Sequence, residues 1–303
     1  MSKVKKVLLT ILAALIGVLL LFCAAFYVFF DVPDWQKLDI SRLSALAQTS
    51  SMYDMNGELM SELRGSENRI IVSLDEIPLH TRQAFIAAED LRFYDHRGID
   101  VYRILGALRS NLKSGSLAEG ASTITQQLAK LTHLSAEKTI RRKLEEINLA
   151  FQIEKVYNKD EILAMYLNTV YFGRGAYGIQ AAAQAYFGVD AEDLTLNQSA
   201  SLAAIIKAPS IYAPHISPSN NRSRRQYILS VMAENGFISQ EEKQAALDES
   251  IWVLAQEAEK QLYSWYIDEA LRESAELLGL SADEVIQGGF KIYTAYDARL
   301  QTI

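Results

Sequence analysis

The sequence predicts a mainly α-helical protein, on the strength of three observations. From Pro78 onward, apolar residues recur three and four positions apart in successive segments that glycines separate. Half of the 303 residues are apolar, which is enough for a sizeable core. Strand-like patterns are confined to two short stretches, near residues 51–63 and 288–296. We therefore expect a helical body with only minor β-structure.

The elements follow in chain order. Residues 51–63 predict two short strands around Asn56-Gly57, because both turn residues tolerate a positive φ. The expected helices are Thr81 to Asp90, Tyr102 to Leu112, Thr123 to Leu131, Ala136 to Tyr157, Lys159 to Asn168, Ala176 to Phe187, Asn197 to Lys207, Arg222 to Asn235 and Glu259 to Leu278. The seventh helix should close at Pro209, Pro214 and Pro218. Phe290, Ile292 and Tyr293 then favour a final strand.

An uncharged apolar run from Val7 to Phe30 precedes this body. At about 1.5 Å per residue it is long enough to cross about 30 Å of hydrocarbon. It is longer than the apolar part of a signal peptide and ends in bulky aromatic residues, so we expect an uncleaved anchor. Lysines precede the run and aspartates follow it: Lys3, Lys5, Lys6, Asp31 and Asp34. This asymmetry predicts a single-pass protein of the plasma (inner) membrane, with a cytoplasmic N-terminus and everything after Asp31 outside the cytoplasm.

Composition excludes several kinds of site. The single cysteine, Cys23, cannot support a disulfide scaffold, a thiolate zinc site or a redox pair. The four histidines lack the spacing of a zinc helix, and no Asp-x-Asp pair is present. We therefore expect no metal site and no required cofactor, and no ligand motif supports a divalent cation. Because 37 acids exceed 30 bases, bulk charge does not predict a nucleic-acid partner.

Glu89 is the first candidate for chemistry. It follows an apolar stretch, Ala84 to Ala88, that would bury most of a helical turn and leave one carboxylate at its edge. Partial desolvation raises the pKa of a carboxylate toward the range that a general acid or base needs. A capped or ion-paired surface glutamate is the alternative. Asp90, Phe93 and His96 follow it in a tight aromatic turn.

A basic helix provides the second candidate site. Between Ala129 and Lys143 the only acid is Glu137, and Glu145 and Glu146 follow directly. The bases in this stretch are Lys130, Lys138, Arg141, Arg142 and Lys143. Such a cluster suits a pyrophosphate, because arginine offers bidentate donors and lysine a mobile charge. A solvated helix face with Glu–Arg pairs remains an equal alternative.

Two further segments are less specific. Gly120 to Gln127 carries neutral hydrogen-bonding groups at the start of a helix, an arrangement that lines sugar sites or orients a neighbouring carboxylate. An apolar stripe with basic flanks begins at Val101, and either core packing or contact with a membrane surface would explain it. Its members are Val101, Ile104, Leu105, Leu108 and Leu112, with Arg103, Arg109 and Lys113 beside them.

Together these segments resemble the peptidoglycan glycosyltransferase family, found in monofunctional transglycosylases and at the front of class A penicillin-binding proteins. The similarity runs from about Tyr53 to Tyr296. Five ordered motifs carry it: Glu89-Asp90-x-x-Phe93-x-x-His96-x-Gly98; Gly120 to Gln127 with Lys130; Arg142-Lys143-x-x-Glu146; Lys159 to Gly188; and Ala203 to Pro214. Ala121 and Lys138 depart from the residues most often found at these positions, glycine and arginine.

The resemblance implies a lysozyme-like helical fold with a small membrane-facing subdomain near residues 100–120. It implies transfer of a lipid-linked glycan to lipid II, with Glu89 as the base and Glu146 as the second essential carboxylate. Lys130, Lys138, Arg142 and Lys143 would stabilise the departing pyrophosphate, and Ser122, Thr123, Gln126 and Gln127 would organise the cleft. Asp90, Phe93, His96 and Asn168 would support it. The implied partners are lipid II, the nascent strand and membrane lipid, with other cell-wall synthesis proteins open.

The implied organisation is a cytoplasmic tail (1–6), an anchor (7–30), a linker with a hairpin (31–74), a glycosyltransferase domain (75–250) and a connector (251–303) toward a transpeptidase domain of a longer parent. Two other functions stay open. A lysozyme-like muramidase also uses a carboxylic acid in a helical cleft, and a catalytically silent assembly scaffold would need no chemistry. Short matches to a penicillin-reactive site, such as Ser135-x-x-Lys138, occur in the wrong order for that enzyme.

Overall fold

A computed structural model of the chain describes residues 49–63, 68–114, 122–133, 139–255 and 265–297, together with residues 5, 13, 14, 16 and 17. Within these ranges, none of the helices has both the length and the apolar character that crossing a bilayer requires. The predicted anchor, Val7 to Phe30, lies outside the described residues apart from a few isolated positions.

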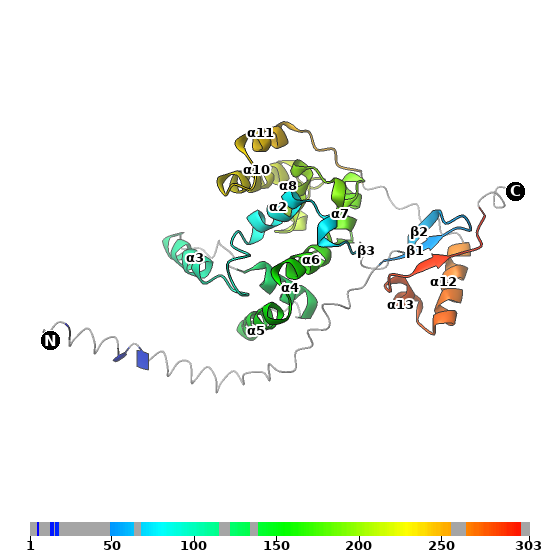
Figure 1. Ribbon diagram of the computed structural model, residues 1–303, viewed down its shortest axis with the longest axis horizontal. Coiled ribbons are helices and arrows are strands. Elements are labelled where there is room, and N and C mark those ends of the chain that lie inside the picture. Colours follow the sequence, from blue (N-terminus) through cyan, green and yellow to red (C-terminus); the bar gives the residue numbers. More distant parts are fainter. Residues whose placement is uncertain are drawn as a thin grey trace.

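The described part of the chain is mainly helical, as the sequence predicts (Figure 1). Its α-helices are α2 (Leu79–Glu89), α3 (Val101–Ser114), α4 (Ile124–His133), α5 (Ile140–Val156), α6 (Lys159–Thr169), α7 (Ile179–Phe187), α8 (Leu196–Ile205), α9 (Pro209–Tyr212), α10 (Pro218–Glu234), α11 (Gln240–Asp248), α12 (Trp265–Leu278) and α13 (Ala282–Ile286). Two 3₁₀ turns, η3 (Leu74–Glu76) and η4 (Ala191–Asp193), lie between them. Each predicted helix has a counterpart here, although residues 136–138 and 259–264 lie outside the described ranges.

Helix α2 lies inside the helical body because its sequence is apolar on more than one face. It packs against α8 and α10 on one side. Phe85 is fully buried, and its ring meets Phe172 edge to face at 5.8 Å. On the other side of the body, α4 packs against α5 and α6. The C-terminal end of α2, which carries Glu89, is therefore held between two groups of helices.

Helix α3 differs from the others in its surroundings. Figure 1 shows it apart from the remaining helices, at the edge of the body. Val101, Tyr102 and Leu105 are exposed, whereas Ala107 is buried. The first half of the predicted apolar stripe therefore faces outward rather than into the core.

The predicted helix Ala176 to Phe187 is wrong at its start. Ala176–Tyr177 form β4, which pairs in parallel with β3 (Asn68–Arg69), and α7 begins only at Ile179. The cause is Gly178, whose φ of 82° and ψ of 161° interrupt a helix. Prolines also act differently from the expectation: Pro209 and Pro218 occupy the first turns of α9 and α10, where proline is favoured.

A small sheet brings together segments from opposite ends of the described chain. Its order is β2 (Leu59–Leu63), β1 (Ser50–Tyr53) and β5 (Lys291–Tyr293). The predicted hairpin is confirmed, since β1 and β2 are antiparallel and Gly57 in the turn has a φ of 80°. β1 and β5 are parallel, with Met52 opposite Ile292. The predicted linker and connector segments therefore share one sheet.

Candidate active site

Glu89 ends α2 with its carboxyl group turned toward α4. Its Oε2 accepts a hydrogen bond of 2.8 Å from the side-chain amide of Gln127. Burial raises the pKa of Glu89 above its usual value, while the Gln127 bond and the positive charges of Arg224, Arg103 and Lys207 oppose this rise. A carboxylate whose pKa is raised is a better proton acceptor, so Glu89 is a candidate general base.

One hollow opens at this carboxyl group, and a second adjoins it. Glu89, Arg103 and Glu234 help to line one of about 360 Å³, here called the carboxylate hollow. Lys207 and Arg224 help to line the second, of about 330 Å³, here called the basic hollow. Tyr227 lines both. A polar substrate can therefore approach Glu89 from a surface that carries both signs of charge.

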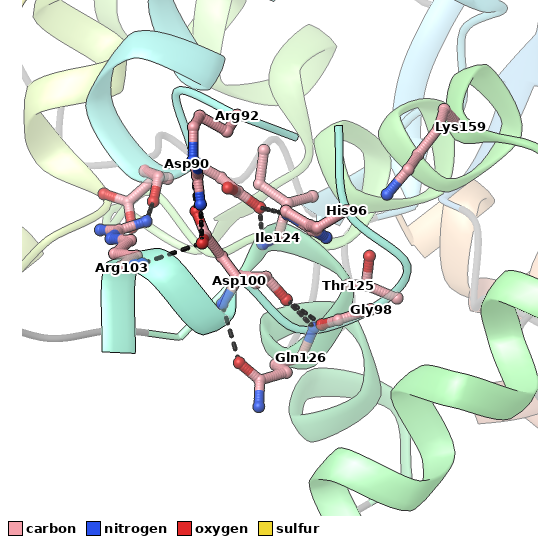
Figure 2. Close-up of polar contacts among 12 residues, drawn as sticks. Asp90, Arg92, His96, Gly98, Asp100, Arg103, Ile124, Thr125, Gln126 and Lys159 are labelled. Atoms are coloured by element: carbon pink, nitrogen blue, oxygen red, sulfur yellow. Dashed lines mark hydrogen bonds and ion pairs between the residues drawn. The ribbon is translucent and has the colours of Figure 1, made fainter. Parts of the chain in front are cut away.

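A buried network holds the start of α4, and Figure 2 shows Asp90, His96 and Ile124 within it. The carboxylate of Asp90, 1% exposed, accepts hydrogen bonds from the amide of Ile124 at 3.0 Å and from Nε2 of His96 at 2.9 Å. A negative charge at a helix N-terminus is favourable because the free amides point toward it. Asp90 therefore fixes the start of α4 to the end of α2, which sets Gln127 opposite Glu89.

Thr123 and Gln126 complete this helix start. The Thr123 amide donates to Oε1 of Gln126 at 2.9 Å, and the Gln126 amide donates to Oγ1 of Thr123 at 3.1 Å. Oγ1 of Thr123 also donates to the Gly98 carbonyl at 2.6 Å. Both side chains are buried, so their polar atoms serve the cap rather than face a ligand.

Phe93 packs against His96 in the same turn. Its buried ring meets that of His96 edge to face, with centroids 6.3 Å apart. The ammonium of Lys159 lies 4.5 Å from the Phe93 ring centre. These contacts hold His96 against Asp90.

The second candidate site lies on α5. Glu146 is 3% exposed and pairs with Lys143, and its Oε2 lies 3.7 Å from Nη1 of Arg142. Nζ of Lys143 also donates to Oγ of Ser122 at 2.8 Å. Arg142 buries its Nε and Nη1, neither of which makes a hydrogen bond to the other described residues, although Nη1 is ion-paired with Glu146. Glu–Arg pairing therefore explains part of this basic helix, and the buried Nε is the donor that it does not explain.

The other predicted residues are distributed as follows. Lys130 is exposed in the last turn of α4. Asn168 is buried in α6, where its side-chain amide bonds the Val72 amide and carbonyl and the Ala164 carbonyl. Lys138 lies outside the described residues. Asn168 is thus committed to holding the chain before η3.

Sequence reasoning missed part of the surroundings of Glu89. Sequence patterns indicate Arg103 on α3 only as a basic residue beside the apolar stripe. They single out neither Arg224 nor Tyr227 on α10. Arg224 comes close to α2 from far along the chain, with its Nη2 3.4 Å from the Ala88 carbonyl. Lys207 falls within the motif from Ala203 to Pro214, but no local pattern connects it with Glu89. Among the described residues, no group of three or more His, Cys, Asp or Glu side chains could hold a metal ion.

Comparison with known proteins fits this geometry. A family model described as Transglycosylase matches residues 56–233. The chain belongs to the transglycosylase family. It is 40% identical to Penicillin-binding protein 1F of Bacillus subtilis over 294 residues, which cover 97% of this chain and 40% of that protein. It is also 40% identical to Penicillin-binding protein 1A of Escherichia coli over 271 residues, which cover 89% of this chain and 31% of that protein.

The transglycosylase chain thus spans less than half the length of these relatives. A crystal structure of Penicillin-Binding Protein 1A from Haemophilus influenzae matches with a TM-score of 0.46 and 26% identity, covering 85% of this chain and 28% of that one. Glu89 and Glu146 both lie within residues 56–233, which the family model matches.

Proposed function

We propose that this transglycosylase polymerises lipid II into β-1,4-linked glycan strands and releases a polyprenyl diphosphate. The observation that carries the proposal is the Glu89 carboxyl group, desolvated, bonded to Gln127 and surrounded by cationic side chains. The mainly helical body is compatible with the lysozyme-like arrangement that the resemblance implies.

In the proposed reaction, Glu89 accepts the proton of the acceptor's 4-hydroxyl group. The hydroxyl oxygen forms a bond to the anomeric carbon of the donor, and the bond from that carbon to the diphosphate oxygen breaks. Attack opposite the leaving group inverts the α-linkage to β. Burial supports this role for Glu89, because a carboxylate with a raised pKa is a better proton acceptor.

The departing diphosphate is the reason for the basic helix. Lys130, Lys138, Arg142 and Lys143 are proposed to stabilise its charge, and the buried Nε of Arg142, which lacks a hydrogen-bond partner among the described residues, supports this assignment. Glu146 is proposed to orient Lys143 and Arg142, with which it pairs. Ser122, which accepts from Lys143, is assigned to the same group. No cofactor or metal is part of the proposal.

The remaining predicted residues are assigned positioning roles. Gln127 orients the Glu89 carboxylate directly. Asp90, His96, Thr123 and Gln126 hold the start of α4. Phe93 and Asn168 act further away, through ring packing and through the chain before η3.

A lipid-linked substrate requires access to a membrane. We propose that residues 7–30 anchor the chain in the plasma membrane with the remainder extracytoplasmic, and that α3 contacts the lipid surface. The exposed Val101, Tyr102 and Leu105 on α3 support the second part. We further propose that residues 75–250 form the glycosyltransferase domain. A longer parent protein would carry a transpeptidase domain, and other cell-wall proteins would recruit it.

Incubation of the full chain in detergent with lipid II tests the function. We expect a polymer that muramidase digests, together with released polyprenyl diphosphate. A muramidase would instead release soluble fragments from finished cell wall, and a silent scaffold would do neither. Failure to form polymer, with lipid II recovered intact, would contradict the proposal.

A further inference from the structure

A chain of charged contacts connects α3 to the main chain of Glu89, and Figure 2 shows Arg92, Asp100 and Arg103 within it. Its centre is Asp100, which is 2% exposed. The Asp100 carboxylate accepts from the Arg103 amide at 2.9 Å, in the first turn of α3, and from Nε of Arg92 at 3.0 Å. A second bond from Arg92 makes this ion pair bidentate.

Arg103 carries the connection to the catalytic end of α2. While its amide bonds Asp100, its Nη1 donates to the carbonyl oxygen of Glu89. The same guanidinium group contributes positive charge to the surroundings of the Glu89 carboxyl group. A displacement of Arg103 would therefore change both the position and the electrostatic surroundings of Glu89.

The other end of this network reaches the exposed face of α3. The Arg92 guanidinium lies 4.6 Å from the ring centre of Tyr102, whose side chain is 76% exposed. Val101 and Leu105 beside it are also exposed. The contacts Tyr102–Arg92–Asp100–Arg103–Glu89 thus lead from an outward apolar surface to the carboxylate end of α2.

We propose that Asp100 is a positioning residue that couples the placement of α3 to the geometry of Glu89. This inference rests on the proposed function. When α3 sits against a lipid surface, Asp100 keeps the first turn of the helix and Arg103 in register with the end of α2. Without Asp100, Arg103 loses its anchor and Glu89 loses its fixed carbonyl contact.

The pH dependence follows from the groups that face Glu89. They are Gln127 from α4, Arg224 from α10, Lys207 after α8, Arg103 from α3 and the buried Tyr166 from α6, while Asp90, Arg92, Asp100 and Glu234 line the same hollow. Of the groups that lower the pKa of Glu89, only Arg103 contacts Asp100. Because Arg103 lowers the pKa of Glu89, its release should raise that pKa and move the acidic limb of the rate profile to higher pH.

The test compares Asp100→Asn and Arg103→Met with Asp75→Asn in the full chain, using lipid II polymerisation in detergent over a pH series. Asp75 is an exposed acid of η3, outside this network, and serves as the control. We expect both network variants to lose about tenfold in kcat, with KM little changed, since the effect is on geometry at the reacting atoms. Their acidic limbs should move to higher pH, whereas Asp75→Asn should match the wild type.

Melting curves and a double variant separate positioning from folding. Asp100→Asn combined with Arg103→Met should be no slower than the worse single variant, since both act through one contact. Should Asp100→Asn fail to fold, Arg103→Met carries the test alone. A wild-type kcat and acidic limb in Arg103→Met would overturn the coupling, as would slower turnover without a shift of the limb. If the wild-type chain itself makes no polymer, the proposed function has failed instead.

Discussion

Gln127 offers a direct way to perturb the Glu89 carboxyl group without altering its charge. Its Nε2 donates to Oε2 of Glu89 at 2.8 Å, and its Oε1 accepts from the buried hydroxyl of Tyr166 at 3.2 Å. Gln127→Met removes both hydrogen-bonding atoms and keeps the side-chain length. Two separate losses in the free energy of unfolding should follow.

The first loss does not depend on pH. Tyr166 is fully buried, and leaving its hydroxyl without an acceptor costs about 1–3 kcal/mol. The second loss requires an ionised Glu89, since a hydrogen bond to a charged group contributes about 1.5–3 kcal/mol. The destabilisation should therefore grow as the pH rises through the pKa of Glu89, which burial raises above its usual value.

Denaturant unfolding of the wild type and of Gln127→Met over a pH series measures the difference in their free energies of unfolding. Gln244→Met is the matched control, because Gln244 donates to a carboxylate at 2.9 Å on an exposed face, where such a bond contributes little. In polymerisation, Gln127→Met should also move the acidic limb to higher pH. A destabilisation that stays constant with pH, or a limb that moves to lower pH, would refute the assignment of Gln127.

Three further predictions concern stability. At pH values above the pKa of Glu89, Glu89→Gln should raise the melting temperature, because burial disfavours the charged form of Glu89. This gain should shrink as the pH falls through that pKa, and melting curves with no gain at alkaline pH would contradict the prediction. Gly178→Ala should lose about 3 kcal/mol or more in denaturant unfolding, since φ is +82° and a Cβ would lie 2.8 Å from the Asn168 carbonyl oxygen, whereas Gly236→Ala, at φ +73° in open space, should lose about 1–2 kcal/mol; equal losses would argue against the close approach. Lys143→Met should lose about 1–3 kcal/mol by leaving Glu146 buried beside Arg142 alone, and adding Glu146→Gln should restore part of it; a double variant less stable than the single one would contradict this.

The helical part of the fold could be predicted from local pattern. Apolar spacing predicts most of the helices, because a helix needs one face for the core wherever it lies in the body, but it misses α11, which buries only Ala246. The predicted helix boundaries are wrong where backbone geometry decides them, as at Gly178, and where a proline starts a helix, as at Pro209. The short α9 and α13 carry too few residues for a period to be visible.

The candidate site was predictable only in part. Glu89 stood out because an apolar run ends at it, and Glu146 because it follows a basic run. The connection of Arg103 and Arg224 with Glu89 depends on how α3 and α10 approach α2, which no local pattern contains. The buried cap that Thr123 and Gln126 form was likewise hidden, since the same residue types serve caps and sugar sites equally well.

The most direct measurement of the central claim compares the rates of lipid II polymerisation by Glu89→Gln and Glu234→Gln. Both carboxylates line the same hollow, but Glu234 is exposed on α10, whereas Glu89 is desolvated at the end of α2. We predict that Glu89→Gln binds lipid II yet polymerises it at least about 100-fold more slowly than the wild type. Glu234→Gln should retain the wild-type rate. Polymerisation by Glu89→Gln at the wild-type rate would contradict the account.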